Sequence, residues 1–257
     1  MKNYIFGYPD LYVYQNDDLF KMSLDSVLLS NFVTLKKSGL ILDIGTGNAP
    51  IPLMLSKRTN AKITGIEIQE SSYALAVDNV LYNKLESRIN IINADAKELN
   101  LKNNFYDVIV CNPPYYKSNM KIANNLSKKI ARSEVLLSLE DIFKISRKAL
   151  KDKGNVAIVN KPNRVCDIIS ISKKLLKNKG NLAIVIRPDR LIEIIELMRK
   201  NNIEPKRIKF IYPKLGKESN IMLIEGIKNG KPGLKVLDPL YVYQNNEYSK
   251  DLLNYVR

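Results

Sequence analysis

Short runs of apolar residues alternate with longer amphipathic stretches along most of this 257-residue chain. Each run has the length and the uninterrupted apolar character of a strand that is buried on both faces. Strands that alternate with helical stretches are typical of an α/β domain built on a mostly parallel sheet. The predicted strands lie at 40–44, 62–66, 89–92 and 106–111.

The chain is expected to have two parts. Residues 1–39 form an N-terminal extension, in which a helix from about Leu24 to Leu35 begins after the capping residue Ser23. Residues 40–257 form the main domain. Two later strands are predicted in the main domain, at Arg207–Tyr212 and Asn220–Glu225.

A tandem repeat interrupts the regular alternation. Residues 145–169 align without gaps on residues 171–195, with 15 of 25 positions identical. Each copy contains a helix end, a Lys-Gly turn, a strand and the start of a new helix, so the repeat is one duplicated strand–helix unit. The two strands are Asn155–Asn160 and Asn181–Ile186. The extra strand could be added to the sheet, displace its twin or loop out, and we expect the first copy to be an added or peripheral element.

A glycine turn, Gly45-Thr46-Gly47-Asn48, follows the first strand and precedes a helix that begins at Pro50. Such a turn lets the backbone approach a ligand closely. Dinucleotide-binding proteins use a similar turn, but Pro50 stands where their third glycine would be, so that alternative is weak.

Acidic residues follow the next two strands at the same edge of the predicted sheet. Glu67 comes at the end of strand 62–66, and Asp95 follows strand 89–92. Open parallel sheets bind ligands at the carboxyl ends of their strands. The Glu67 carboxylate can accept hydrogen bonds from both hydroxyls of a ribose, and Asp95 is placed to bind an adenine amino group. The edge is therefore predicted to hold a cofactor that contains adenosine.

The tetrapeptide Asn112-Pro113-Pro114-Tyr115 follows strand 106–111 and carries the most specific chemistry. The exocyclic amine of adenine is a poor nucleophile and needs acceptors for its two N–H groups. The side-chain oxygen of Asn112 and the carbonyl of Pro113 can be these acceptors, and two prolines would hold them in place. A base can stack on Tyr115, which contributes roughly 1–3 kcal/mol. The tetrapeptide therefore predicts a site that holds a planar NH2 group and stabilises the charge that forms on it.

Together these residues resemble the class I S-adenosylmethionine-dependent methyltransferases that modify amino groups. The chain is most similar to the tRNA1(Val) (adenine(37)-N6)-methyltransferase family. The resemblance implies a Rossmann-like class I fold with a mostly parallel seven-stranded sheet and a C-terminal antiparallel pair, to which the duplicated unit is added. The segments that carry the resemblance are 20–30, 45–48, 65–70, 111–115, 131–134, 187–191, 204–207 and 238–240.

The resemblance also implies an activity, which is methyl transfer from S-adenosylmethionine to N6 of an adenine in RNA, with adenine 37 of a tRNA as the expected target. It implies that Asn112, Pro113, Pro114 and Tyr115 are catalytic. It further implies that the extension 1–39 packs on the cofactor site, and that the cofactor is surrounded by Asp25, Asp43, Gly45, Gly47, Asn48, Glu67, Asp95 and Asn112. One departure is Ala49, where family members usually carry glycine, and its methyl group is expected to affect cofactor affinity.

The charge predicts the type of substrate. The net charge is +15, and residues 144–217 contain 20 Lys and Arg against 6 Asp and Glu. Phosphate contacts dominate nucleic-acid affinity, so a basic half on an amine-methylating domain predicts a nucleic-acid partner. The stretch 116–134 directly follows the tetrapeptide and is a candidate lid over the substrate. The predicted substrate-binding residues are Lys117, Lys121, Arg132, Arg187 and Arg190.

The composition argues against several other classes of protein. With no histidine and only Cys111 and Cys166, neither a metal site nor a disulfide framework is expected. No run approaches the ~18 apolar residues of a membrane span. Pro9 and Asp10 directly follow a short apolar stretch, which argues against a signal peptide. We therefore expect a cytoplasmic enzyme that does not act at a membrane, and the sequence makes no prediction of its oligomeric state.

Three alternatives share these features, and one of them is methylation of an adenine in ribosomal RNA or DNA. An N5-methyltransferase that acts on a glutamine of a release factor uses the same Asn-Pro-Pro-Tyr, because a side-chain amide poses the same chemical problem. Such enzymes usually carry a helical substrate domain before the first strand, where this chain has only the extension 1–39. The third alternative is a nucleic-acid-binding relative that has lost catalysis, which Ala49 and the repeat favour and which a measurement of cofactor binding would test.

Overall fold

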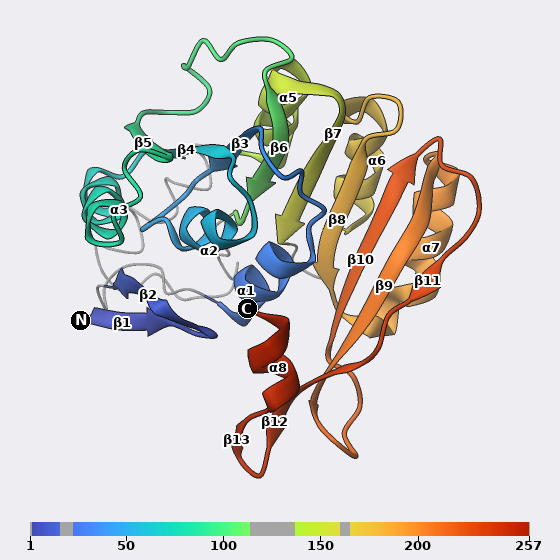
Figure 1. Cartoon of the computed structure of the whole chain (residues 1–257). Helices are drawn as coiled ribbons and strands as arrows, with labels where there is room; N and C mark the ends of the chain where they lie inside the picture. Colours follow the sequence, from blue (N-terminus) through green and yellow to red (C-terminus); the bar gives the residue numbers. More distant parts are fainter. Residues whose placement is uncertain (1, 16–22, 114–136, 160–164, 257) are drawn as a thin grey trace, which may run out of the picture.

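The computed structural model describes residues 2–15, 23–113, 137–159 and 165–256. In these residues the chain forms one large sheet with helices on both faces, together with a small N-terminal hairpin (Figure 1). The strands of the large sheet are β3 (Leu40–Ile44), β4 (Lys62–Glu67), β5 (Ile89–Asn93), β6 (Tyr106–Cys111), β7 (Leu150–Val159), β8 (Asn181–Ile186), β9 (Ile203–Lys214), β10 (Ile221–Lys228), β11 (Lys235–Val236), β12 (Leu240–Gln244) and β13 (Glu247–Tyr248).

The strand order is β13-β12-β9-β10-β8-β7-β6-β3-β4-β5, with β11 paired to β9. Strands β3 to β8 pair in parallel, while β10 is antiparallel to both β8 and β9. These eight strands correspond to the predicted seven-stranded sheet with its antiparallel pair and the duplicated strand, so the predicted fold class is confirmed. Strands β11, β12 and β13 extend the sheet beyond β9 and were not predicted.

The tandem repeat adds a strand in the interior of the sheet. The two copies pair at the offset of the repeat, so that Asn155 lies opposite Asn181 and Val159 lies opposite Val185. The expectation of an added strand is thus confirmed, but a peripheral place for the first copy is wrong, because β7 lies between β6 and β8. Val156 to Val159 are buried on both faces, and such a strand needs neighbours and cover on both sides.

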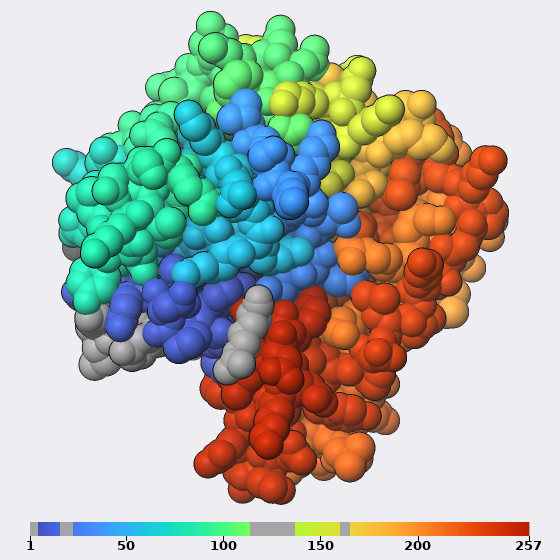
Figure 2. Space-filling view, in the orientation of Figure 1, coloured from blue at the N-terminus to red at the C-terminus, as the bar shows by residue number. Residues whose placement is uncertain are grey.

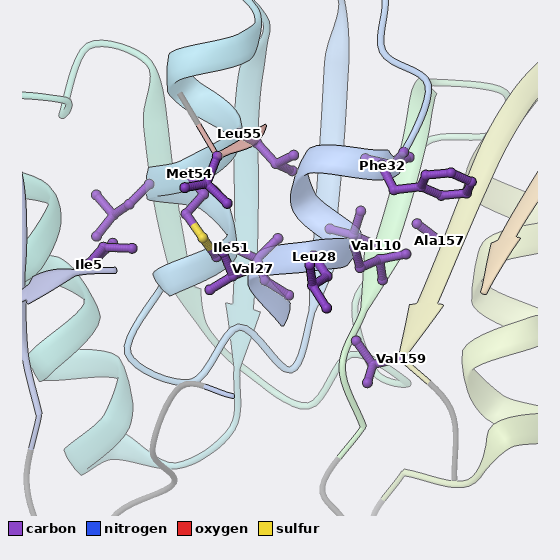
Figure 3. Close-up of a cluster of buried hydrophobic side chains, with 14 of the residues drawn as sticks. Ile5, Val27, Leu28, Phe32, Ile51, Met54, Leu55, Val110, Ala157 and Val159 are labelled. Atoms are coloured by element: carbon purple, nitrogen blue, oxygen red, sulfur yellow. The ribbon is translucent and has the colours of Figure 1, made fainter. Parts of the chain in front are cut away.

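Alternate residues of the strands face two different hydrophobic clusters, as the pleat of a strand requires. On one face, Ala157 and Ala183 lie in the cluster that contains α1 (Leu24–Phe32) and α2 (Pro50–Arg58) (Figure 3). On the other face, the neighbouring residues of β7 and β8 pack against α5 (Leu139–Ala149), α6 (Val165–Leu175) and α7 (Leu191–Lys200). The small alanines allow α1 to lie close over the paired repeat strands.

The N-terminal extension begins with a hairpin that was not predicted. Strands β1 (Lys2–Ile5) and β2 (Tyr8–Tyr14) pair antiparallel, and the hairpin lies beside the C-terminal segment (Figures 1 and 2). The rings of Phe6 and Tyr248 have centroids 3.9 Å apart. Gly7 adopts φ +79°, and a Cβ there would lie 1.8 Å from Cγ2 of Val256. The close packing of the two ends of the chain therefore requires glycine at position 7.

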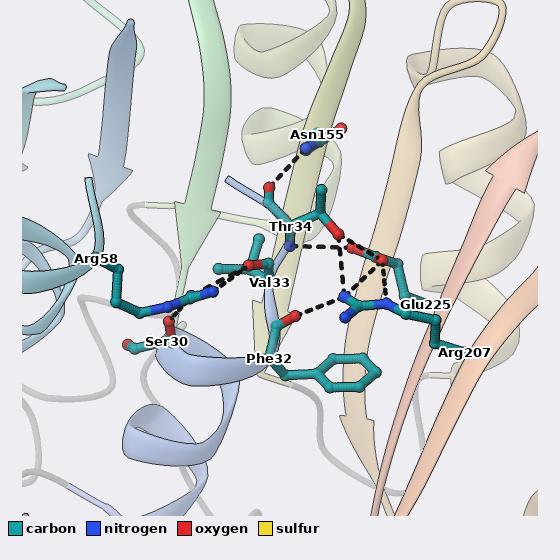
Figure 4. Close-up of polar contacts among 8 residues, drawn as sticks. All are labelled: Ser30, Phe32, Val33, Thr34, Arg58, Asn155, Arg207 and Glu225. Carbon is teal, nitrogen blue, oxygen red and sulfur yellow. Dashed lines mark hydrogen bonds and ion pairs between the residues drawn. The ribbon is translucent and has the colours of Figure 1, made fainter. Parts of the chain in front are cut away.

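Helix α1 ends in the interior, where arginines bind its carbonyl groups (Figure 4). Arg58 Nη1 donates to the carbonyls of Ser30 and Val33, and Arg207 Nη2 donates to the carbonyl of Phe32 at 2.7 Å. The last carbonyls of a helix have no partner within the helix, so these side chains satisfy groups that burial would otherwise leave unpaired.

A buried carboxylate balances the charge at this helix end. Glu225 lies on β10 and receives hydrogen bonds from Arg207 Nε at 2.9 Å, from the Thr34 amide at 3.2 Å and from the Thr34 hydroxyl at 2.8 Å. Asn155 Nδ2 donates to the Thr34 carbonyl at 2.7 Å. Strands β7, β9 and β10 are therefore all tied to the end of α1.

Each helix among the described residues is too short or too polar to span a bilayer.

Candidate active site

Predicted site residues at the ends of four neighbouring strands lie along one edge of the sheet. Strands β5, β4, β3 and β6 are neighbours, and their carboxyl ends lead into Asp95, Glu67, the glycine turn and Asn112 respectively. The chain winds outward from β3 to β5 and then returns to β6 on the other side of β3. This reversal is the place where open α/β sheets bind their ligands.

The glycine turn is open on its outer side. Gly45 and Gly47 adopt φ values of +72° and +57°, which glycine accepts without strain. The Gly45 and Thr46 amides donate to the Ile66 carbonyl, at 2.9 and 3.0 Å, so the turn is held to β4. No atom would lie within 4 Å of a Cβ built on Gly45 or Gly47. The turn therefore offers free space beside the backbone for a ligand.

Glu67 holds the glycine turn from the neighbouring strand. Its Oε2 accepts from the Gly47 amide at 2.8 Å, and its Oε1 accepts from the Gln69 amide at 2.8 Å. Burial raises the pKa of Glu67 above its usual range. Each carboxylate oxygen keeps acceptor capacity beyond these bonds. At the end of β5, Asp95 Oδ1 accepts from the Lys97 amide at 2.9 Å, and Lys97 Nζ lies 3.5 Å from Oδ2.

Asp43 is a buried acid at the end of β3. Thr46 Oγ1 donates to its Oδ2 at 2.6 Å, while its Oδ1 has no hydrogen-bond partner among the described residues. Burial raises the pKa of Asp43 to about 7, and the neighbouring charge of Glu67 acts in the same direction. A buried acceptor without a partner is unfavourable in the ligand-free protein, so a ligand that donates to Oδ1 would be stabilised there.

Asn112 is held in one orientation by helix α1. Its Nδ2 donates to Ser26 Oγ at 2.8 Å, and its Oδ1 is buried without a hydrogen-bond partner among the described residues. Ser26 Oγ lies 3.2 Å from Ser23 Oγ, and the latter also accepts from the Ser26 amide at 3.3 Å. The chain of hydroxyls binds the NH2 end of the amide and leaves the oxygen without a partner among the described residues, so that it can accept a hydrogen bond from a ligand.

Ser26 was missed by the sequence analysis. It lies 86 residues before Asn112 in the chain, and no spacing rule connects the two. The available signals were its place next to Asp25 and three residues after the capping residue Ser23. Asp25 itself is half-buried on α1, and burial raises its pKa.

The N-terminal extension is attached beside the glycine turn. Asn48 Nδ2 donates to the Tyr14 carbonyl at 2.9 Å, and Asn79, on α3 (Glu70–Tyr82), accepts from the Tyr14 amide at 2.7 Å. Asn79 Nδ2 also donates to the Asn48 carbonyl at 2.9 Å. The Asn48 side chain therefore fixes the extension. The extension contacts both sides of the edge, through Tyr14 at the glycine turn and through Ser26 at Asn112.

Some of the predicted residues fall in a part of the chain that the structure does not describe. Pro114, Tyr115, Lys117, Lys121 and Arg132 lie outside the described residues, as does the whole stretch 116–134 expected to form a lid.

Arg187 and Arg190 follow β8, which lies two strands away from β6. At the usual strand spacing, β8 and β6 are about 10 Å apart. Arg187 Nε lies 3.4 Å from an oxygen of Asp189, and Arg190 Nη2 lies 2.5 Å from an oxygen of Glu193. The two arginines share the edge of the site, but neither is brought next to Asn112. In the part of the chain that the structure describes, no group of three or more acidic or cysteine side chains could hold a metal ion.

Several known proteins are similar to this chain in sequence or in fold. The sequence profile of the methyltransferase small domain family matches residues 21–166, more than half of the chain. The tRNA1(Val) (adenine(37)-N6)-methyltransferase of Parabacteroides distasonis is 32% identical over 160 residues, which cover 62% of this chain and 67% of that protein. The enzyme of the same name from Bacteroides fragilis is 31% identical over 161 residues, which cover 62% and 68% of the two chains.

The chain belongs to the tRNA1(Val) (adenine(37)-N6)-methyltransferase family. It is an S-adenosylmethionine-dependent methyltransferase. A crystal structure of a predicted O-methyltransferase from Agrobacterium tumefaciens has the same fold, with a TM-score of 0.55 and 18% identity over 91% of this chain and 97% of that one.

The described residues fit the cofactor of this methyltransferase family. The open space beside Gly45 and Gly47 admits a ligand against the backbone, and the acceptors of Glu67 and Asp43 can receive hydroxyl or amino donors. S-adenosylmethionine carries such donors on its ribose, adenine and amino-acid parts. That each of these residues binds the cofactor stays a prediction.

Ala49 has a backbone conformation that favours glycine. It is the N-cap of α2 and adopts φ +64° and ψ +33°, the left-handed region, with no side-chain hydrogen bond. Its side chain is fully buried. The left-handed conformation costs a residue with a Cβ roughly 1–2 kcal/mol. Alanine at position 49 therefore strains the backbone locally, next to the glycine turn.

Substitution of Asp43 is expected to change how stability depends on pH. The pKa of Asp43 is about 7 in the folded protein and about 3.9 in the unfolded chain, so the unfolded state binds fewer protons between these pH values. The free energy of unfolding therefore falls as the pH rises through this window, by at most about 4 kcal/mol. In the ligand-free Asp43→Asn variant this fall should disappear. Urea denaturation at pH 5 and pH 8 measures it.

Asp107→Asn is the control of opposite sign. Burial alone would raise the pKa of Asp107, but hydrogen bonds from Lys151 and Lys36 outweigh it and lower the pKa to about 2. Its stabilisation is complete above the unfolded pKa, so this variant should lose stability equally at pH 5 and pH 8. An Asp43→Asn variant with the same pH slope as the unmodified protein would contradict the prediction.

Relief of the strain at position 49 should stabilise the protein. Ala49→Gly removes the Cβ from a left-handed position and is expected to raise the free energy of unfolding by about 1 kcal/mol. Ala76→Gly, at a fully buried helical position of α3, is the matched control and should lower it by about 1 kcal/mol. Denaturation curves measure both changes, and calorimetric titration with S-adenosylmethionine should show equal or tighter binding for Ala49→Gly. A less stable Ala49→Gly variant would show that position 49 is unstrained.

Proposed function

We propose that this chain transfers a methyl group from S-adenosylmethionine to N6 of an adenine in RNA, and that adenine 37 of a tRNA is its target. The observation that carries the proposal is the Asn112 amide. Its NH2 end is bound by Ser26, and its buried oxygen, beside the glycine turn, has no hydrogen-bond partner among the described residues. The names of the relatives from Parabacteroides distasonis and Bacteroides fragilis support the nucleotide and the RNA.

The residues of the chain act by holding and polarising the amine. Bound S-adenosylmethionine supplies an activated methyl group. Asn112 Oδ1 accepts one N–H of the adenine amine, and the Pro113 carbonyl accepts the other. Acceptors fixed in advance stabilise the positive charge that develops on nitrogen during attack. No side chain needs to remove a proton beforehand, which agrees with a chain that contains no histidine, and the proton leaves to water after transfer.

The basic half of the chain favours RNA over a protein substrate. A release-factor glutamine would satisfy the same two acceptors, so the geometry of Asn112 does not distinguish the amide from adenine. The charge does, since residues 144–217 carry a net +14 that a neutral protein loop does not require. An inactive relative would have no use for an oriented but unpaired acceptor, because an unpaired buried oxygen destabilises the fold.

Product analysis tests the proposal directly. The protein is incubated with labelled methyl donor and, separately, with total tRNA, ribosomal RNA, DNA or release factor, and the products are digested and separated. We expect N6-methyladenosine in tRNA, at position 37. Asn112→Ala should lower turnover by a factor of about 100 or more, as loss of one preorganised group does elsewhere, while the dissociation constant of the cofactor changes little. Methylglutamine in the release factor, or no product from any substrate, would refute the proposed adenine N6-methylation of tRNA.

Ser26 is a positioning residue for Asn112, and its loss should affect turnover selectively. Without the hydroxyl, the Asn112 amide can rotate, so Ser26→Ala is expected to lower kcat about tenfold, near the value of one lost hydrogen bond, with cofactor affinity unchanged. Ser30→Ala is the matched control, because Ser30 is a buried serine on the same helix whose hydroxyl has no hydrogen-bond partner among the described residues. Ser26→Thr should restore turnover. Equal rates for Ser26→Ala and Ser30→Ala would remove Ser26 from the mechanism.

A further inference from the structure

Three neighbouring helices each carry a pair of basic residues in their last turn, and the pairs follow one another at a constant spacing of 26 residues. Helices α5, α6 and α7 pack side by side on one face of the sheet (Figure 1). All six side chains are exposed, whereas the residues just before each pair, Ser146, Ser172 and Met198, are fully buried. The three helix ends therefore present the same face to solvent. We call them the dibasic row, and its members are Arg147, Lys148, Lys173, Lys174, Arg199 and Lys200.

The dibasic row lies at the edge of the sheet opposite to the candidate active site. Each helix is followed directly by a strand, so its C-terminal end lies where that strand begins. Asn112 and the glycine turn lie where β6 and β3 end. A strand of six residues such as β6 is about 20 Å long at 3.3 Å per residue. A ligand that contacts both places must therefore extend over about 20 Å or more.

The positive charge of the row is mostly unbalanced. Arg199 Nε lies 3.5 Å from an oxygen of Glu204, which is the one ion pair of the row among the described residues. Lys228 adds a further cation, because its Nζ donates to the Lys173 carbonyl at the end of α6. Burial lowers the pKa of Lys228, and the nearby charges of Lys173 and Arg147 lower it further. Like charges are thus close enough to repel, as at a surface that an anion normally covers.

A hollow with many hydrogen-bond donors adjoins the first pair of the row. It has a volume of about 470 Å³ and is lined by Asn103, Asn104, Lys144, Arg147 and Lys148. Ammonium, guanidinium and amide groups are the donors that phosphate oxygens accept from. The hollow makes this part of the row a shaped surface rather than a set of separate solvated side chains.

Helix electrostatics explains only part of this arrangement. A cation in the last turn of a helix contributes typically 0.3–1 kcal/mol through the helix dipole. That contribution is available to each helix end separately. It does not account for the hollow at Asn104 and Lys144. Nor does it account for the placement of Lys228 near the like charges of Lys173 and Arg147, which opposes stability.

We propose that the dibasic row is a second RNA-binding surface, which contacts the phosphate backbone of the substrate about 20 Å or more from the base that is methylated. The proposal rests on the proposed RNA methyltransferase function and adds to it the requirement for a long, structured RNA. The tandem duplication has a binding role in this proposal, because the added unit lengthens the row by one dibasic pair.

The test removes four charges from the row and measures RNA affinity as a function of salt. The variant Arg147→Gln/Lys148→Gln/Lys173→Gln/Lys174→Gln keeps long side chains with good helix propensity. Its affinity for an unmodified tRNA transcript should fall at least tenfold at about 0.1 M salt. Each phosphate contact contributes about 0.9 to the slope of log K against log salt, so the loss of four contacts should make the slope less steep by about 3.6. Filter binding measures both quantities without any need for activity.

The matched control carries the same change in net charge elsewhere. Lys217, Lys231, Lys235 and Lys250 are exposed lysines of the C-terminal part, and their replacement by glutamine should leave tRNA affinity within about twofold. Denaturation midpoints and calorimetric titration with S-adenosylmethionine should be unchanged in both variants. Equal loss of affinity in the two variants would reduce the row to a non-specific effect of net charge and overturn the proposal.

RNA length separates the remote surface from the active site. The row variant should lose affinity for the full tRNA transcript and keep its affinity for the isolated anticodon stem–loop. An equal loss for both RNAs would place the contact at the target loop and overturn the remote surface. A variant with unchanged tRNA affinity that no longer binds anionic phosphatidylserine vesicles would assign the row to lipid instead. If the unmodified protein methylated tRNA but the row variant bound it normally, only this inference would fail, whereas an unmodified protein that bound no RNA would refute the proposed function as well.

Discussion

The buried end of helix α1 is the constraint on which the rest of the structure depends. A helix that ends inside a protein leaves several carbonyl groups without water or helical partners, and each unpaired group would destabilise the fold by about 1–3 kcal/mol. Here Arg58, Arg207 and Asn155 donate to the carbonyls at and just beyond the end of α1, and Glu225 offsets the charge of Arg207. These partners come from α2, β9, β7 and β10. The helix is thereby fixed to three strands of the sheet and to α2, and so is the serine that it brings to Asn112.

Polar groups are treated differently at the end of α1 and at the candidate active site. The Glu225 carboxylate receives several hydrogen bonds, while Asp43 Oδ1 and Asn112 Oδ1 are buried acceptors without partners among the described residues. Both unpaired acceptors lie at the carboxyl edge, on the adjacent strands β3 and β6. The fold therefore gives up stability at the place where a ligand can restore it, and the stiff surroundings of α1 keep these acceptors from finding other partners. This contrast within one molecule is a stronger argument for a binding site than either oxygen alone.

Local sequence patterns predicted most strands of the sheet, but they did not predict contacts between residues far apart in the chain. The predicted strands 40–44 and 106–111 agree with β3 and β6, because buried parallel strands have a distinctive apolar composition. The glycine turn and Asn112 were predicted from their place after these strands. Ser26 was missed because its contact with Asn112 spans 86 residues and depends on how α1 crosses the sheet. The N-terminal hairpin was missed for the same reason, since β1 and β2 pack against the C-terminal segment at Val256 rather than on neighbours in sequence.

The interior position of the duplicated unit shows how a parallel sheet can accept an extra strand without loss of its site. Strands β7 and β8 have the same alternation of residues, so both present alanine to α1 and larger apolar side chains to the opposite helices. Gly180 packs against the carbonyl of Gly154. A Cβ built on Gly180 would lie only 2.8 Å from that carbonyl oxygen, so only glycine fits there without a shift. The copies therefore stack as equivalent units one strand apart, and each new helix covers the strand before it. Because the addition lies on the side of β6 away from β3, the four strands that carry the glycine turn, Glu67, Asp95 and Asn112 keep their neighbours, and the change is confined to the basic half of the protein.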